Sequence, residues 1–169
     1  MTTVGDINHG VRNAVAARPH ELALADPPNR SAVFGGDPHR LSWLELDGWI
    51  GAAAAQLNDA GVRPGDRVGI QLPNVVELPI TILACLRIGA VAVPFPVQHR
   101  EHELRYGLGT AEVSVMVTAP RPDRPDQLAM VAGASEYLSD PPQVVAPVGV
   151  PAGGSVQVDP DATSTDTLA

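Results

Sequence analysis

Apolar and polar residues alternate along the middle of the chain in two different periods. Between residues 42 and 61, apolar residues recur every three or four positions, which is the spacing of one face of an α-helix. Further along, short and almost continuously apolar runs alternate with helical segments. The predicted order is a strand at 67–72, a helix at 75–88, a strand at 90–95, a helix at 99–108 and a strand at 113–119.

Strands that alternate with helices in this way predict an α/β fold. The expected architecture is a layered, mostly parallel sheet with flanking helices and right-handed crossovers. The strand at 90–95 is apolar on both faces, which favours a central position in the sheet. The helix at 75–88 is apolar almost all round, which is typical of a helix buried on more than one side.

Residues at the helix ends support these boundaries. Ser42 and Glu45 have the S-x-x-E spacing of a capping box, and Gly61 follows as a residue that tolerates a left-handed conformation. Asn74 and Glu77 form a second arrangement of this kind at the start of the next helix, which ends at Gly89. Both helices therefore carry start and stop signals in the sequence.

The glycine-containing stretch 61–66, GVRPGD, raises the question of a phosphate-binding loop. Pro64 and Gly65 are the pair that a type II turn prefers at its two central positions. A phosphate-binding glycine loop follows a strand and opens a helix, whereas this stretch follows a helix and opens a strand. We interpret it as a joint.

The two ends of the chain are less regular. The N-terminal part predicts a helix at 7–20, a strand at 21–26 and a weaker strand at 31–34 between turn clusters. We expect residues 1–119 to form a partial α/β subdomain. Residues 120–169 are expected to contain a linker and an acidic, poorly ordered tail. Between these lie a helix at 127–138 and an edge strand at 143–147.

The amino-acid composition argues against several classes of function. The 169 residues carry a formal charge of −8, which argues against a nucleic-acid or anionic-membrane partner. All eleven basic residues are arginine, so a P-loop lysine or a Schiff base is excluded. The N-terminus lacks the pattern of a secretory signal, and no apolar stretch approaches the roughly 20 residues that span a bilayer. We expect a cytoplasmic protein.

Few residues suggest chemistry. His99 and His102 lie three positions apart beside Glu101 and Glu103, which would be half of a metal site, but a solvated helix face is the preferred interpretation. No serine has a G-x-S-x-G context. We therefore assign no catalytic, cofactor-binding or metal-binding residue.

The other candidates also have simpler interpretations. Arg100 and Arg105 are expected to pair with Glu101 or Glu103 rather than with a ligand, and Trp43 and Trp49 to pack in the core. The single cysteine, Cys85, lies in an apolar run and is expected to be a buried, inert thiol.

Five short motifs, in order, resemble the N-terminal region of the adenylate-forming enzymes, the acyl- and aryl-CoA synthetases and their relatives. The resemblance covers roughly residues 12–119. The matching motifs are Ser42-Trp43-Leu44-Glu45-Leu46, then Gly61 with Gly65, Asp66 and Val68, then Pro73-Asn74, then Gly89-Ala90-Val91 with Pro94, and finally Arg100 with Glu103-Leu104.

This resemblance implies a parent enzyme that joins a carboxylic acid to ATP, releases pyrophosphate and then transfers the acyl group to a thiol such as coenzyme A. It implies ATP, Mg²⁺ and coenzyme A for the parent and none of them for this chain. The family's Ser/Thr/Gly-rich phosphate loop, adenine-binding motif and catalytic lysine have no match in the sequence. The matching residues have architectural roles, so we expect the chain alone to be inactive.

Three hypotheses follow from the sequence. The first is an N-terminal fragment of an acyl-CoA synthetase, with a fatty acid or another carboxylic acid as the parent's substrate. An aryl-acid parent is an alternative, because His99-Arg100 resembles the aryl-acid adenylating enzymes. The second is a non-catalytic module that pairs with another chain or with itself through an exposed sheet edge. The third is a small nucleotide-binding protein unrelated to the ligases.

Overall fold

The computed structural model describes residues 7–149, which form six helices and six strands within that range. In chain order they are α1 (Ile7–Ala17), β1 (Leu22–Ala25), α2 (Arg30–Val33), β2 (Arg40–Ser42), α3 (Trp43–Asp59), β3 (Arg67–Gln71), α4 (Glu77–Arg87), β4 (Val91–Pro94), α5 (Glu101–Thr110), β5 (Val113–Thr118), α6 (Gln127–Ser135) and β6 (Gln143–Val145). The tail expected to be poorly ordered lies largely outside the described residues, beyond residue 149.

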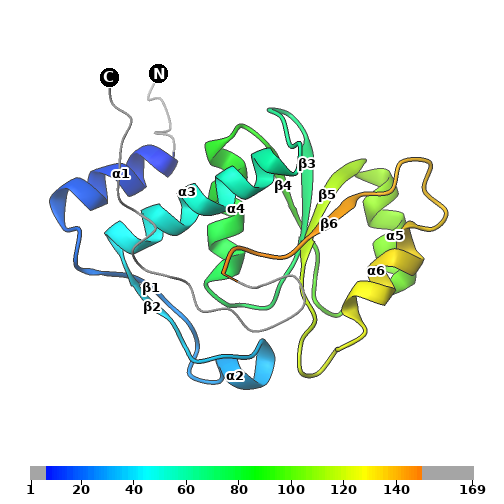
Figure 1. Cartoon of the computed structure of the whole chain (residues 1–169), viewed down its shortest axis with the longest axis horizontal. Coiled ribbons are helices and arrows are strands. Elements are labelled where there is room, and N and C mark those ends of the chain that lie inside the picture. Colours follow the sequence, from blue (N-terminus) through cyan, green and yellow to red (C-terminus); the bar gives the residue numbers. More distant parts are fainter. Residues whose placement is uncertain (1–6, 150–169) are drawn as a thin grey trace.

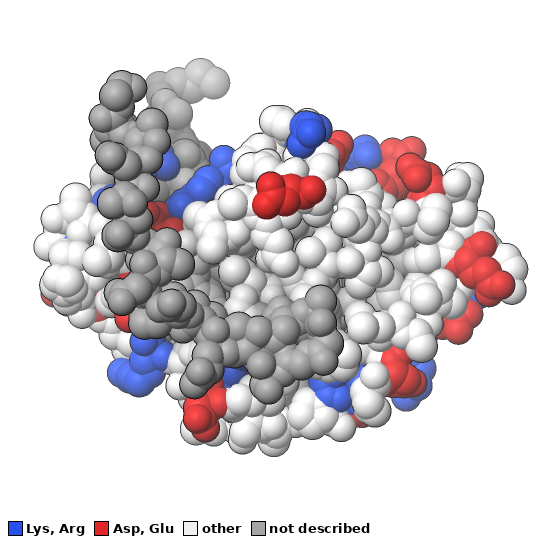
Figure 2. Space-filling view, viewed as in Figure 1, with Lys and Arg blue, Asp and Glu red and all other residues white. Residues whose placement is uncertain are grey.

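A four-stranded parallel sheet with the order β4-β3-β5-β6 forms the centre of the fold. Helices α3 and α4 lie on one side of it and α5 and α6 on the other, as Figure 1 shows. The layered α/β architecture expected from the sequence is therefore confirmed. Charged side chains of both signs are scattered over the face shown in Figure 2.

The sheet separates two apolar clusters. The larger cluster lies between the sheet and helices α1, α3 and α4, and includes the fully buried side chains of Ile50, Ile70 and Ile80. The smaller cluster lies under α5 and α6, where Leu104 and Met116 are completely buried. Helices on both faces explain why the central strands β3 and β5 are apolar on both sides.

The prediction that the strand at 90–95 is central is wrong. β4 pairs with β3 alone and forms an outer strand of the described sheet, with Val91 48% exposed. Pro94 lacks a backbone N–H, and such a residue is tolerated at a sheet edge. The opposite outer strand, β6, has only three residues. Both features limit pairing with a further strand.

Most predicted helix ends are confirmed. Ser42 and Glu45 form the capping box, with Glu45 N donating to Ser42 Oγ over 3.3 Å and Ser42 N to Glu45 Oε2 over 2.7 Å. Gly61, with φ of +90°, follows the last residues of α3, and Gly89, with φ of +74°, follows those of α4. Gly65 also has φ of +90°, as the predicted type II turn requires.

The N-terminal part differs from the prediction at one element. β1 pairs antiparallel with β2, but the weak strand expected at 31–34 is the short helix α2. Its first residue, Arg30, is buried and bonded to Asp26 and Glu77. These tertiary contacts outweigh the weak strand propensity of a four-residue segment.

The helix and edge strand expected after residue 120 are α6 and β6. The carbonyl of Ala146 accepts a hydrogen bond from Gln56 of α3 over 3.0 Å, so the segment after β6 is tied to the main body. Within residues 7–149, no helix is both long and apolar enough to cross a membrane.

Candidate functional site

The two central strands end side by side, because Gln71 of β3 lies opposite Thr118 of β5. β3 connects through α4 to β4 on one side, whereas β5 connects through α6 to β6 on the other. Ligands of open α/β sheets bind outside the carboxyl ends of the strands where the connections reverse in this way. This end of the sheet is therefore the candidate site.

A cluster of polar side chains occupies the space beyond these strands. The Nε2 atom of Gln71 donates to the carbonyl oxygens of Pro96 and His99, over 2.9 and 3.2 Å. Its Oε1 atom accepts a hydrogen bond from Gln127, at the start of α6. Arg124 donates to the His99 carbonyl oxygen over 3.4 Å. Gln71 and Gln127 are each 2% exposed, so these amides hold the loop between β4 and α5 rather than facing solvent.

A second polar cluster closes the start of α4. Arg30 Nη1 lies 2.9 Å from Asp26 Oδ2 and 2.8 Å from Glu77 Oε2, and Arg30 Nη2 lies 2.6 Å from Glu77 Oε1. The side chains of Asp26, Arg30 and Glu77 are 0%, 5% and 1% exposed. Burial lowers the pKa of the Arg30 guanidinium, but the two carboxylates outweigh this effect and raise the pKa above its usual value.

The predicted cap of α4 by Asn74 is wrong. The N-cap position is Val76, whose backbone N–H donates to Asp26 Oδ1 over 2.8 Å. Glu77 does not complete a capping box with Asn74, because both of its carboxylate oxygens bind Arg30. An anion at a helix N-terminus is held by free backbone N–H groups. At α4 a carboxylate of the protein itself takes this place.

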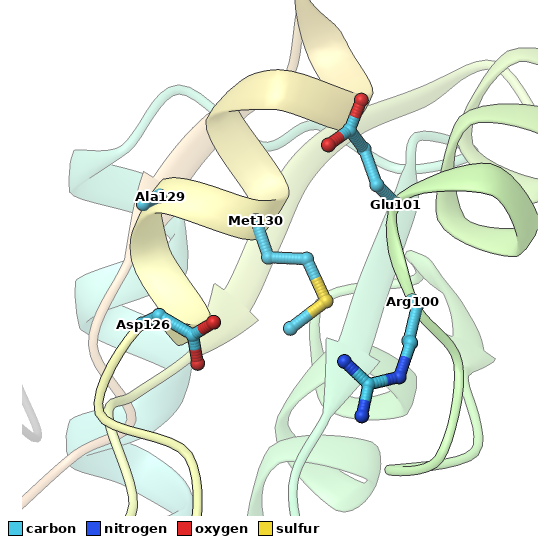
Figure 3. Close-up of a pocket in the computed structure, with 5 residues that line it drawn as sticks. All are labelled: Arg100, Glu101, Asp126, Ala129 and Met130. Atoms are coloured by element: carbon cyan, nitrogen blue, oxygen red, sulfur yellow. The ribbon is translucent and has the colours of Figure 1, made fainter.

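A shallow surface depression of about 420 Å³ lies beside the loop held by Gln71. As Figure 3 shows, Arg100 and Glu101 line it from the start of α5, and Asp126, Ala129 and Met130 from α6. Two carboxylates and one guanidinium give this lining no net attraction for an anion. Small-molecule sites are usually enclosed and lined mainly by apolar side chains. This depression is open, and three of its five lining residues are charged.

The two histidines near the start of α5, His99 and His102, lie in different surroundings. His102 is exposed, whereas the partly buried His99 packs its ring against Phe95 with the ring centroids 6.5 Å apart. The described residues contain no group of three or more His, Cys, Asp or Glu side chains that could hold a metal ion. The preferred interpretation of a solvated helix face fits His102, but not His99.

The remaining candidates agree with the simpler interpretations, with one exception. Arg105 pairs with Glu101 over 2.9 Å, as expected. The exception is Arg100, which has no carboxylate within ion-pair distance among residues 7–149 and lines the depression instead. Trp43 and Trp49 are partly buried and pack against the core. Cys85 is fully buried, and burial raises the pKa of its thiol to about 12.

The two buried polar clusters were not predicted from the sequence. A signal for the second cluster was present, since Glu77 lies in the apolar run VVELPI, where a charge requires a partner. The sequence does not reveal that partner, because Arg30 lies 47 positions away. Gln71 and Gln127 gave no comparable signal. Each is a single glutamine at the end of a predicted strand or the start of a predicted helix, where an exposed polar residue is ordinary.

A family model and several known proteins match most of this chain in sequence. Residues 20–165 match the model of the family described as "AMP-binding enzyme". A salicylyl-CoA synthase / salicylate adenylyltransferase from a Streptomyces species is 38% identical over 82% of this chain and 24% of its own length. An acetyl-coenzyme A synthetase from Rubrobacter xylanophilus is 36% identical over 64% of this chain and 17% of its own length.

Solved structures of the N-terminal part of related enzymes also resemble this chain. The N-terminal domain of FACL13 from Mycobacterium tuberculosis superposes with a TM-score of 0.68 over 85% of this chain and 34% of that chain, at 22% identity. The chain thus spans about a quarter or less of the curated relatives and corresponds to the N-terminal portion of adenylate-forming enzymes. These matches exclude a small protein unrelated to the ligases. Because the family model covers most of its length, the chain belongs to the AMP-binding enzyme family.

Proposed function

We propose that this chain is the scaffold portion of an enzyme that activates a carboxylic acid with ATP. In the proposed reaction, a carboxylate oxygen attacks the α-phosphorus of ATP. The bond to the bridging oxygen breaks and pyrophosphate leaves with the electron pair, which yields an acyl-adenylate. A thiol then displaces AMP. The observation that carries the proposal is the match of residues 20–165 to the AMP-binding enzyme family.

The described residues do not fit the phosphates of ATP. The N-terminus of α4, at the candidate site, is filled by Asp26, whose Oδ1 accepts the Val76 N–H. The sequence has no lysine that could hold a phosphate. Within residues 7–149, no cluster of His, Cys, Asp or Glu offers three ligands for Mg²⁺. We therefore assign no step of the reaction to these residues, and place ATP binding in other parts of the enzyme.

We further propose an aromatic acid as the parent's substrate. The relative named for salicylate matches 82% of this chain, whereas the one named for acetyl-coenzyme A matches 64% at a similar identity. The His99-Arg100 pair, which resembles aryl-acid adenylating enzymes, points the same way. A fatty or other aliphatic acid is the alternative.

An exchange experiment tests the proposal. In the Streptomyces relative, the stretch that matches this chain is replaced by the corresponding residues of this chain, and ATP–pyrophosphate exchange is measured with salicylate, acetate and palmitate. We expect exchange that depends on salicylate. A folded chimera that exchanges with none of the acids would contradict the proposal, and exchange with palmitate alone would contradict the aromatic assignment.

A further inference from the structure

The loop between β4 and α5, residues 95–100, is held by a glutamine side chain of β3. Gln71 is 2% exposed, and its Nε2 atom donates to the carbonyl oxygens of Pro96 and His99 over 2.9 and 3.2 Å. An amide group has its donors on the nitrogen and its acceptors on the oxygen. Gln71 therefore holds the loop only while the nitrogen of its amide faces these two carbonyl groups.

A second glutamine sets the orientation of that amide. Gln127, at the start of α6, donates from Nε2 to the Oε1 atom of Gln71, and it is also 2% exposed. This bond keeps the oxygen of the Gln71 amide on the α6 side and leaves the nitrogen for the loop. Within residues 7–149, the side chain of Gln127 makes no hydrogen bond to the loop itself. Its effect on the loop therefore passes through Gln71.

The start of α6 is linked to the same loop by a second route. Arg124 donates to the carbonyl oxygens of Val97 and His99 over 3.1 and 3.4 Å. The backbone N–H of Gln127 donates to the Arg124 carbonyl oxygen over 3.4 Å, so both side chains belong to one turn. The loop and the start of α6 are thus held together as one unit.

Two side chains of the loop keep unused binding capacity. The Nδ1 atom of His99 is buried and has no hydrogen-bond partner within residues 7–149. Arg100 has no carboxylate within ion-pair distance in the same range, and it lines the depression beside α6, as Figure 3 shows. Buried polar groups are nearly always paired in folded proteins. A loop with a fixed backbone and two unused polar side chains is suited to bind a further group.

We infer that Gln71 and Gln127 are positioning residues of the acid-activating reaction. Gln127 orients the Gln71 amide, and Gln71 holds His99 and Arg100 in place for the acid. The inference rests on the proposed function, because it takes the loop as part of the site of a carboxylic acid. The loop borders the carboxyl ends of the parallel strands, where ligands of such sheets bind.

The acid is the substrate that this loop would serve, because the described residues do not fit the phosphates of ATP. A guanidinium binds a carboxylate through two parallel hydrogen bonds, which require a defined geometry. The lining of the depression has no net attraction for an anion, so recognition of a carboxylate depends on where the Arg100 guanidinium is held. Loss of either glutamine should therefore weaken the binding of the acid and not that of ATP.

Methionine variants test the hydrogen bonds in the 169-residue chain. Gln71→Met and Gln127→Met remove the amides but keep the length of the side chain. Gln56→Met is the matched control, because Gln56 donates to the Ala146 carbonyl oxygen over 3.0 Å, away from the loop. The readout is hydrogen exchange of the His99 amide. We expect exchange about tenfold faster in Gln71→Met, about threefold faster in Gln127→Met and unchanged in Gln56→Met.

The amides of β5 are the internal reference for this measurement. Exchange that rises equally at His99 and in β5 would mean that the variants destabilise the whole fold, and it would overturn the inference. Exchange at His99 in Gln127→Met that equals that of the unsubstituted chain would also overturn it. If Gln71→Met does not fold, Gln127→Met decides, because that side chain reaches the loop through Gln71.

The role in the reaction is tested in the chimera with the Streptomyces relative. Gln71→Met and Gln127→Met should each raise the KM for the acid in ATP–pyrophosphate exchange about fivefold, and leave the KM for ATP within about twofold. A merely structural role would lower the amount of active enzyme and leave both KM values unchanged. An unchanged KM for the acid, or an equal rise of the KM for ATP, would overturn the inference.

The inference and the proposed function fail separately. An unsubstituted chimera that exchanges with none of the acids would contradict the proposed function, whereas the exchange of the His99 amide in the free chain would still decide whether Gln127 acts on the loop. An active chimera whose KM for the acid is insensitive to both variants would contradict only the positioning role.

Discussion

Replacing Arg30 by methionine should destabilise the protein far more than an equivalent change at the surface. Methionine keeps the length and packing of the side chain but removes the guanidinium. Asp26 and Glu77, whose side chains are 0% and 1% exposed, would then remain buried without their counter-charge. A buried carboxylate that loses its partner is costly, because the protein interior replaces little of its hydration.

The size of the loss in unfolding free energy depends on how deeply the ion pair is buried. Breaking a buried ion pair from one side costs about 3–5 kcal/mol of the free energy of unfolding. Arg67→Met is the control, because Arg67 also lies 2.9 Å from a carboxylate, that of Glu112, but both side chains are largely exposed. An exposed pair contributes about 0–1 kcal/mol. The two variants should therefore differ by about 2–5 kcal/mol in the free energy of unfolding.

Urea unfolding followed by the fluorescence of Trp43 and Trp49 measures the difference. With a urea dependence of about 2 kcal/mol per molar, Arg30→Met should lower the midpoint by about 1.5–2.5 M, and Arg67→Met by less than about 0.5 M. If Arg30→Met is already unfolded in buffer, the double variant Arg30→Met/Glu77→Met remains informative. It removes both charges and should be more stable than Arg30→Met alone. Unfolding free energies of Arg30→Met and Arg67→Met within 1 kcal/mol of each other would show that the buried carboxylates do not depend on Arg30.

Two further predictions concern local structure. Ser42→Ala should cost about 1 kcal/mol in urea unfolding at pH 7, because it removes the cap of α3. Hydrogen bonds from Ser42 lower the pKa of Glu45, so this stabilisation is present above the unfolded pKa of about 4.3 and is lost as the pH falls through the folded pKa. A cost that stays constant between pH 7 and pH 3 would contradict this coupling. Gly69→Ala should lower the midpoint of thermal unfolding, because its Cβ would lie 2.7 Å from Met116 Sδ in the core, whereas Gly10→Ala, with open space around it in α1, should leave the midpoint unchanged or raise it.

The sequence predicted the elements well where local signals agree. The capping box at Ser42, the apolar period of α3 and the glycines at 61 and 89 all act within a few residues, and all are confirmed. The predicted central position of β4 was wrong, because an apolar strand at a sheet edge has the same sequence pattern of apolar residues as a central strand. Strand order depends on contacts between distant segments, which a local pattern does not contain.

The polar clusters of the candidate site were beyond prediction for the same reason. Asn74 has the residue type and spacing of a helix cap, yet Asp26, 50 positions away from Val76, provides the acceptor. The bond between Gln127 and Gln71 spans 56 positions. Local propensity favours Asn74 as the cap of α4. In the folded protein, the buried carboxylate of Asp26 lies at this helix end instead. A hydrogen bond to a buried carboxylate is stronger than one to an exposed amide.

We propose that these residues build a scaffold and that ATP is held elsewhere in the enzyme. Calorimetric titration of the folded 169-residue chain with ATP and Mg²⁺, with and without salicylate, tests this claim most directly. We expect no saturable heat and no pyrophosphate released above background. Saturable binding of ATP by the chain alone, or pyrophosphate released in proportion to its concentration, would contradict it.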